Sequence, residues 1–127
     1  MSIETPDVLV VGLGPAGSRA AAVAVAAGLN VIALERRKTA GSPVQCAEFV
    51  PGLIEHDVPA VRTVTAQKVS RMLTFVGAHP LQITDHFQGL MIDRCAFDRL
   101  LAEEAARDGA ECRYSETVSC RSMGTER

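Results

Sequence analysis

The sequence predicts an α/β fold, and three features near its amino terminus support this prediction. An apolar run at 8–11 is followed by glycines in the pattern G-x-G-x-x-G over residues 12–17. An alanine-rich stretch covers 18–27, and a second apolar run at 31–34 ends at the acid Glu35. A strand, a glycine turn, a helix and a second strand in this order are typical of a Rossmann-like unit that binds a dinucleotide.

The three glycines have separate predicted roles. Gly12 allows the tight turn after the first strand, and Gly14 lets a pyrophosphate approach the backbone. Gly17 permits close packing of the helix on the sheet. Pro15 suits the first helical turn, where its missing N–H is no loss, so we expect a helix from Pro15 to Ala27. Its positive end would face the phosphates.

The second strand is predicted at 31–34, and Gly28 is expected to end the preceding helix in a left-handed conformation. Glu35 at the end of this strand can accept hydrogen bonds from ribose hydroxyls and would repel a 2′-phosphate, which argues against NADP. A basic run at 36–38 follows. It is either a solvated loop or a group of cations near the adenine or a phosphate.

The rest of the chain predicts a loop, an antiparallel insertion and a second β-α-β segment. A Gly/Pro-containing loop is expected at 36–52, with Pro51 starting a short helical turn. Two alternating runs joined by a turn at 77–80 indicate a hairpin. The further elements predicted are these: strands at 67–75, 81–87, 89–94 and 110–118, and a helix at 96–107 capped by Asp93.

Composition is that of a soluble globular domain. The 127 residues are 47% hydrophobic and 22% charged, with a formal net charge of −2. Five aromatic residues, four Phe and one Tyr, argue against a nucleic-acid partner. The apolar stretch 20–29 is too short to span a bilayer, and Glu4 and Asp7 precede it where a signal peptide needs positive charge. We therefore expect a cytoplasmic protein without a transmembrane segment.

The cysteines and histidines predict no metal site. No two cysteines have the C-x-x-C spacing, and the three histidines are scattered. In a cytoplasmic chain the cysteines are expected to be thiols. They are Cys46, Cys95, Cys112 and Cys120.

Four segments together resemble a known family. They are 10–18 with its glycines, Glu35-Arg36, 43–48 with the pattern Pro-x-x-Cys-x-Glu, and 92–102 with Asp-Arg-x-x-Phe-Asp. This combination is similar to the amino-terminal part of the geranylgeranyl reductase family. Those proteins are FAD-dependent oxidoreductases related to the p-hydroxybenzoate hydroxylase fold. The resemblance implies a Rossmann-like FAD-binding domain with an antiparallel insertion, here incomplete.

The resemblance also implies a set of cofactor-binding residues. The glycines would contact the FAD pyrophosphate, and Glu35 would hold the adenosine ribose with Arg36 beside it. Cys46 and Ala47 would lie near the flavin ring, and Arg94 would reach the phosphates. Two alternatives stay open: a salt bridge between Arg94 and Asp98, and a Cys46 that is a buried small residue rather than a catalytic one. The full set is Gly12, Gly14, Pro15, Ala16, Gly17, Glu35, Arg36, Cys46, Ala47 and Arg94.

Length is the main departure from the family. Its members run to several hundred residues and carry a later Gly-Asp segment that contacts the ribitol of FAD, whereas this sequence contains no Gly-Asp dipeptide. We expect residues 1–118 to be the amino-terminal part of the FAD-binding domain and 119–127 to be an irregular tail. A truncated or frame-shifted reading frame would explain both the missing segment and the tail.

Three functional hypotheses follow. In the first, a flavoprotein reduces carbon–carbon double bonds of a lipid-like isoprenoid, with NAD(P)H or ferredoxin as electron donor and peripheral membrane association as one option. In the second, the same fold serves an FAD-dependent aromatic hydroxylase or halogenase. In the third, the chain is a non-catalytic fragment, too short to be active alone and weak in binding FAD.

Overall fold

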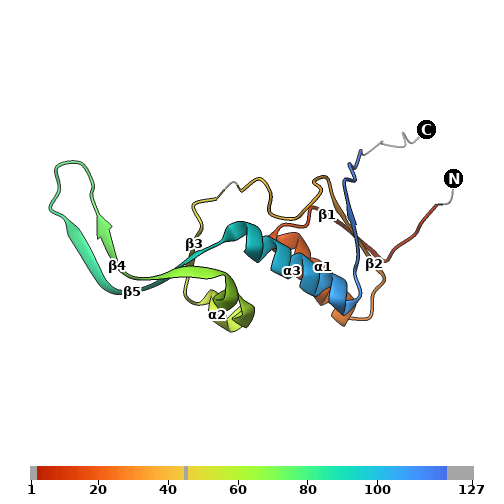
Figure 1. Cartoon of the computed structure of the whole chain (residues 1–127), viewed down its shortest axis with the longest axis horizontal. Coiled ribbons are helices and arrows are strands. Elements are labelled where there is room, and N and C mark those ends of the chain that lie inside the picture. The colour runs from red at the N-terminus through yellow and green to blue at the C-terminus, as the bar shows by residue number, and fades with distance from the viewer. Residues whose placement is uncertain (1–2, 45, 120–127) are drawn as a thin grey trace, which may run out of the picture. The chain divides into compact units, whose positions relative to one another are not determined.

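The computed structural model describes residues 3–44 and 46–119. These divide into two compact units (Figure 1). The first unit combines the described residues up to Ser42 with those from Asp98 onward, and the second runs from Pro43 to Phe97.

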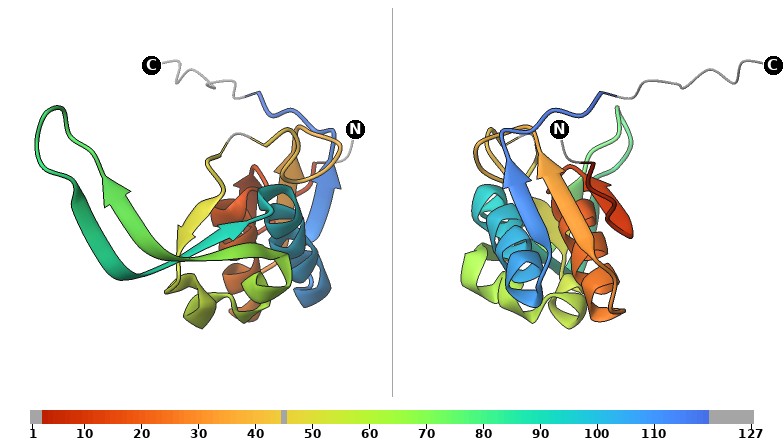
Figure 2. Two further views of the ribbon diagram at one scale, coloured as in Figure 1. Left: turned by 60° about the vertical axis from the view of Figure 1, so that its left-hand side comes forward. Right: turned by 90° about the vertical axis from the view of Figure 1, so that its right-hand side faces the viewer.

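The first unit is built on a parallel sheet. Its strands are β1 (Val8–Val11), β2 (Val31–Glu35) and β6 (Glu111–Tyr114), in the order β1-β2-β6. Both pairings are parallel, and Figure 2 shows the strands side by side in its right-hand view. The order places β2 at the centre, and its residues are almost all buried. The α/β prediction is therefore confirmed.

Helix α1 (Pro15–Ala26) connects β1 to β2. It begins at the expected proline and ends one residue before the expected end. Gly28 has a φ of +82°, so the left-handed conformation predicted after the helix is present. The Leu29 N–H then returns to the Ala24 carbonyl at 3.2 Å, which closes the helix end.

Helix α3 (Arg94–Asp108) starts two residues earlier than the sequence predicted. Asp93 caps it as expected, because its Oδ1 accepts a hydrogen bond of 2.9 Å from the Ala96 N–H. From Asp98 onward α3 belongs to the first unit. There its alanines join a core whose small side chains allow helices and sheet to approach closely. The buried core consists of Val10, Leu13, Ala21, Ala22, Val31, Ala33, Ala40, Ala102, Ala105 and Ala110.

The second unit is built on an antiparallel sheet. Its strands are β3 (Phe49–Pro51), β4 (Thr65–Thr74) and β5 (Gln82–Ile92), in the order β3-β5-β4. Between β3 and β4 lie the short helix α2 (Ile54–Asp57) and the 3₁₀ helix η1 (Pro59–Val64). The left-hand view of Figure 2 shows β4 and β5 as one long hairpin. The predicted insertion with its turn near 77–80 is present.

Two expectations for this unit were wrong. The runs at 81–87 and 89–94 form the single strand β5, which pairs with β3 and β4 and lies outside the parallel sheet. Gly89, the expected first residue of the second run, lies within β5 and is buried under an aromatic ring. A Cβ there would lie 2.3 Å from Phe49 Cε2, so glycine is required by packing rather than by a turn.

Two segment boundaries also differ from the prediction. The loop expected at 36–52 ends in β3, of which Pro51 is the last residue. The short helical turn expected to start at Pro51 is present as α2, which begins three residues later. Strand β6 stops at Tyr114 instead of 118 because Ser115 has a φ of +62°, which extended backbone does not allow. Of the predicted tail, residue 119 is described and 120–127, including Cys120, lie outside the described residues.

Within 3–44 and 46–119, no helix has the length and apolar character needed to cross a bilayer. The same residues contain no group of three His, Cys, Asp or Glu side chains placed to hold a metal ion.

Candidate functional site

The glycine turn leads from the carboxyl end of β1 into α1 and is hydrogen-bonded to the carboxyl end of β2. Gly12 has a φ of +97°, and its N–H donates a 2.7 Å hydrogen bond to the Leu34 carbonyl. Gly17 faces this turn so closely that a Cβ there would lie 1.9 Å from the Gly12 carbonyl oxygen. No side chain fits at Gly17. The close approach predicted for this glycine is therefore to the turn as well as to the sheet.

The surface over the turn is open. A Cβ added at Gly12 or Gly14 would meet nothing within 4 Å. Gly14 is the N-cap of α1 with a φ of −78°, and no side chain caps the helix or places an acid in its first turn. The first N–H groups of a helix have no partner within the helix. Those of α1 are consequently available to an acceptor that approaches over Gly12 and Gly14.

One turn into α1, Ser18 adds an unusual feature. Its side chain is fully buried, and its Oγ has no hydrogen-bond partner among the described residues. A buried hydroxyl without a partner is costly. Ser18 ends the motif segment 10–18, but the sequence predicts no role for it, because only the structure shows its burial.

Glu35 ties the glycine turn to the end of β2. Its Oε2 accepts a 2.9 Å hydrogen bond from the Leu13 N–H, and its Oε1 accepts one of 3.0 Å from the Arg37 N–H. The side chain is buried. Two oxygens of an ionised carboxylate offer about four acceptor positions, so these bonds leave capacity for a ligand hydroxyl. Arg36, directly after Glu35, is exposed.

A hollow of about 400 Å³ lies in the same unit beside the ends of β2 and β6. Tyr114, the register partner of Glu35, lines it together with Cys112 and Lys38. Burial raises the pKa of the Tyr114 phenol, with nearby Cys112 and acids adding to the effect. Burial also raises the pKa of the Cys112 thiol. Both groups are therefore held in their neutral forms.

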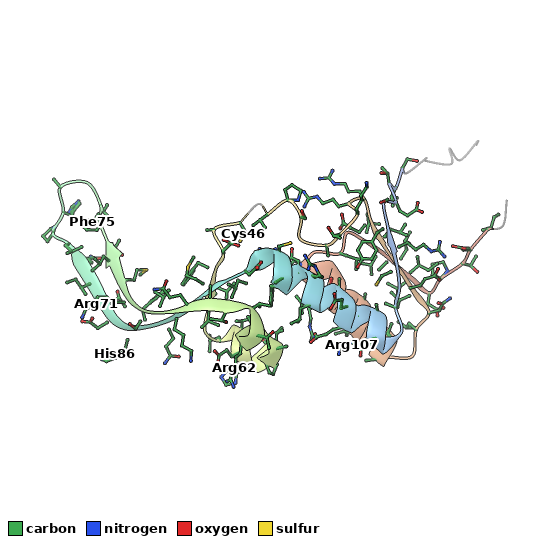
Figure 3. The ribbon with its side chains drawn as sticks, viewed as in Figure 1. Cys46, Arg62, Arg71, Phe75, His86 and Arg107 are labelled. Carbon is green, nitrogen blue, oxygen red and sulfur yellow. The ribbon has the colours of Figure 1, made fainter. Side chains whose placement is uncertain are left out.

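In the second unit, Glu48 connects three parts of the chain. Its N–H lies 3.4 Å from Cys46 Sγ, its carbonyl accepts from the Ile92 N–H at 2.8 Å, and its Oε1 accepts from the Arg94 N–H at 3.2 Å. Glu48 itself has a φ of +60°. Cys46 and Ala47 are exposed on the loop before β3, where Figure 3 labels Cys46. Cys46 is exposed, so the alternative that it is a buried small residue is wrong.

The structure thus gathers the predicted residues in two places. The first unit holds the glycine turn with Glu35 and Arg36, and the second holds Cys46, Ala47 and Arg94. Glu48 was missed as a site residue although it ends the quoted Pro-x-x-Cys-x-Glu pattern. The feature that could have indicated it is an acid directly before β3, which lies in the stretch predicted to be a loop.

No known family model matches the chain. The digeranylgeranylglycerophospholipid reductases of Methanosarcina acetivorans and Methanocella arvoryzae are 41% and 39% identical to it, over 113 and 112 residues. These matches cover 84% and 83% of this chain. The chain is a homologue of the amino-terminal part of these reductases. It spans only 28% of the length of each.

Two further proteins agree with this result. The uncharacterized protein in the nifH2 5′ region of Methanosarcina barkeri is 36% identical over 121 residues, which are 83% of this chain and 62% of that protein. The crystal structure of a geranylgeranyl bacteriochlorophyll reductase-like protein from Thermoplasma acidophilum matches with a TM-score of 0.79 and 35% identity. It covers 90% of this chain and 31% of the other. The resemblance inferred from the sequence is confirmed.

More distant structures share the fold alone. The myxobacterial chondrochloren halogenase, described as a variant of FAD-dependent halogenases, matches with a TM-score of 0.73 at 21% identity. It covers 89% of this chain and 29% of the halogenase. The hydroxylase or halogenase alternative is thus supported by the shared fold alone, whereas sequence similarity favours the reductases.

Proposed function

We propose that the chain binds FAD, with the pyrophosphate over the glycine turn between β1 and α1. One observation carries the proposal. Gly12 and Gly14 have no side chains, and the space where a Cβ would lie is open at both. At Gly17 a side chain is excluded, because the Gly12 carbonyl lies against it. A phosphate could therefore reach the uncapped start of α1, where N–H groups and the helix dipole favour an anion. Pro15 and Ala16 lie in that first turn.

The buried Ser18 hydroxyl, one turn into α1, is a second feature that a ligand could satisfy. Its buried Oγ lacks a partner among the described residues. A water or a ligand oxygen that enters the turn would supply a hydrogen bond that the protein alone does not.

Glu35 is proposed to accept hydrogen bonds from the adenosine ribose, with Arg36 beside the adenosine. Support comes from the fixed position of the Glu35 carboxylate, which two backbone N–H groups hold at the end of β2. A buried carboxylate there would repel a 2′-phosphate, so FAD is favoured over NADP.

The residues of the second unit are proposed to serve the rest of the cofactor. From the family resemblance, Cys46 and Ala47 would lie near the flavin ring and Arg94 would contact phosphates. Glu48 supports this assignment, because its hydrogen bonds to the Cys46 sulfur and the Arg94 N–H hold the loop before β3 beside the start of α3. Cys46 remains a candidate for a catalytic role on the same grounds.

Bound FAD would supply hydride transfer, and the protein would bind and orient it. For a protein of the reductases' full length, we propose reduction of isoprenoid double bonds in a membrane lipid, with NAD(P)H or ferredoxin as electron donor. Such a substrate is consistent with a cytoplasmic protein that associates peripherally with a membrane. For this chain, which spans 28% of those reductases, we propose cofactor binding without turnover.

The experiment compares FAD and NAD binding by the chain and by Gly14→Val. Gly14 has a φ that valine tolerates and open space for its side chain, so the fold is retained while the pyrophosphate site is blocked. We expect Gly14→Val to raise the Kd for FAD at least about tenfold, or about 1.4 kcal/mol. Ala20→Val, on an exposed position of the same helix, is the control and should leave the Kd unchanged. Preferred binding of NAD, or FAD binding unaffected by Gly14→Val, would overturn the proposal.

A further inference from the structure

A bulge interrupts the β4–β5 hairpin in the second unit. The register pairs on its two sides are Val69↔Gly89 and Arg71↔Asp85. Between these pairs β4 contributes Ser70 alone, whereas β5 contributes residues 86–88. Extra residues in one strand interrupt the ladder, bend the strand and redirect its side chains. We call residues 70 and 86–88 the hairpin bulge, and Figure 3 labels His86 where the hairpin bends.

His86 has an unusual backbone conformation within the hairpin bulge. Its φ of +59° lies in the left-handed region, which residues other than glycine rarely occupy. In the part of the chain that the structure describes, its imidazole has no hydrogen-bond or ion-pair partner that would explain this conformation. Backbone of this kind is concentrated at active sites and ligand-binding sites. His86 is therefore a candidate for contact with a ligand.

A hollow of about 370 Å³ lies against the hairpin bulge. The polar side chains that line it are those of Glu55, Lys68, Ser70, His86 and Gln88. The Gly52 N–H donates a 3.0 Å hydrogen bond to the Gln88 carbonyl, which ties the chain after β3 to the hairpin bulge. Because α2 begins two residues after Gly52, this bond also fixes α2 beside the hollow. The hollow therefore lies entirely within the second unit.

The charges around the hollow leave one cation without a counter-ion. Glu55 is paired with Arg62, whose Nε and Nη2 donate to its Oε2 at 3.1 and 2.8 Å. Asp85, at the border of the hairpin bulge, is paired with Arg71 at 2.6 Å. Lys68 has no acid partner among the residues that the structure describes. These two acids are thus neutralised, and the Lys68 ammonium remains for an anionic ligand.

We propose that this hollow binds a phosphate group, with Lys68 as its counter-ion and Ser70, His86 and Gln88 as hydrogen-bond donors. An ammonium has three donors, an amide two, and a hydroxyl or a neutral imidazole one. A phosphate offers several acceptor oxygens, and hydrogen bonds between charged partners are the strong ones. The hollow and the glycine turn share no residue, so the proposal does not depend on FAD binding.

A cation fits the same hollow poorly. The Lys68 ammonium would repel it, and the Glu55 carboxylate that lines the hollow already pairs with Arg62. Across 3–44 and 46–119, no three His, Cys, Asp or Glu side chains are placed to hold a metal ion. The charge of the lining therefore favours an anion.

The test titrates the ¹⁵N-labelled chain with inorganic phosphate and follows its amide signals by NMR. We expect shifts at residues 68–71 and 85–89, which sodium chloride at equal ionic strength does not produce. Lys68→Gln should raise the Kd for phosphate at least about tenfold, because a charged hydrogen-bond donor is lost. The control is Arg107→Gln, which removes one positive charge from an exposed position in the first unit and should leave the Kd unchanged.

His86→Gly separates the imidazole from the backbone that carries it. Glycine adopts a positive φ without strain, so the hairpin bulge and the unfolding temperature should be retained. The Kd for phosphate should rise about fivefold, as expected for the loss of one neutral hydrogen bond. An unchanged Kd in both His86→Gly and Lys68→Gln would overturn the proposal, as would shifts at the hairpin bulge that sodium chloride reproduces.

Lipid vesicles distinguish the two sources of a phosphate group. Vesicles of phosphatidylcholine with phosphatidic acid that bind the chain, but neither Lys68→Gln nor His86→Gly, would assign the site to a lipid headgroup. Binding of inorganic phosphate without vesicle binding would assign it to a soluble phosphate compound. Both results support the site, and the absence of both overturns it. Phosphate shifts confined to residues 12–14 and 16–18 would also overturn it, while leaving the FAD proposal standing.

Discussion

Glu35 shows how one residue joins the fold to the candidate site. The sequence predicts that Glu35 lies at the end of β2 and accepts hydrogen bonds from a ribose. In the structure its carboxylate also accepts the Leu13 and Arg37 N–H groups. It therefore holds the glycine turn against the neighbouring strand before any cofactor binds. The ribose contact stays a prediction, and the structural contact could not be foreseen because it depends on the path of the turn.

Glu35→Gln is predicted to destabilise the chain. A glutamine amide can accept only one of the two N–H hydrogen bonds and turns its own donor toward the other N–H. We expect the free energy of unfolding to fall by about 1–3 kcal/mol, the usual cost of leaving such a group unsatisfied. Urea unfolding measures it. The control is Glu103→Gln, which makes the same charge change at an exposed side chain. An equal fall in the free energy of unfolding in this control would contradict the explanation.

Gly17 and Gly89 show two different reasons for a required glycine. At Gly17 a Cβ would collide with the Gly12 carbonyl, and the spacing of the glycine motif predicts such closeness. At Gly89 the obstacle is the ring of Phe49 on another strand. Pattern reasoning explains the first glycine because its partner is local. It fails at the second because the partner is 40 positions away along the chain.

At the level of elements, β1, α1 and β2 were predicted well because their signals are local. Each signal lies within a few residues of the element that it predicts: the apolar runs of the strands, Pro15 at the start of α1 and Gly28 after its end. β5 was divided into two strands because its continuity depends on pairing with β3 and β4. Strand β3 and helix η1 were missed, since short elements have little periodicity of their own.

Asp93 provides a test at the same level. It caps α3 by accepting the Ala96 N–H at 2.9 Å. Asp93→Ala should lower the free energy of unfolding by about 0.5–2 kcal/mol, the range for lost N-caps. Asp93→Asn keeps an oxygen acceptor and should recover most of the stability. Thermal unfolding of the three proteins compares them, and an asparagine variant as unstable as the alanine variant would show that capping is not the cause.

At the level of the whole molecule, the proposed cofactor-binding turn lies in the first of the two units. The first unit has a glycine turn with open space above it. Among the described residues, nothing pairs with the outer edge of β1. The reductases that the chain matches are more than three times as long as the shared part, which covers 28% of them. We expect FAD binding by this chain to be weak, because it spans only 28% of those reductases and would leave much of the flavin half exposed.

The most direct test of the FAD proposal is an NMR titration of the ¹⁵N-labelled chain with FAD and with ADP, which carries the adenosine and pyrophosphate alone. We predict that both ligands shift the same amide signals, those of residues 12–14, 16–18 and 35–37, and that FAD alone shifts further signals. Weak binding does not hide such shifts. Shifts confined to other residues, or no shifts at millimolar FAD, would contradict the claim that the glycine turn holds the cofactor.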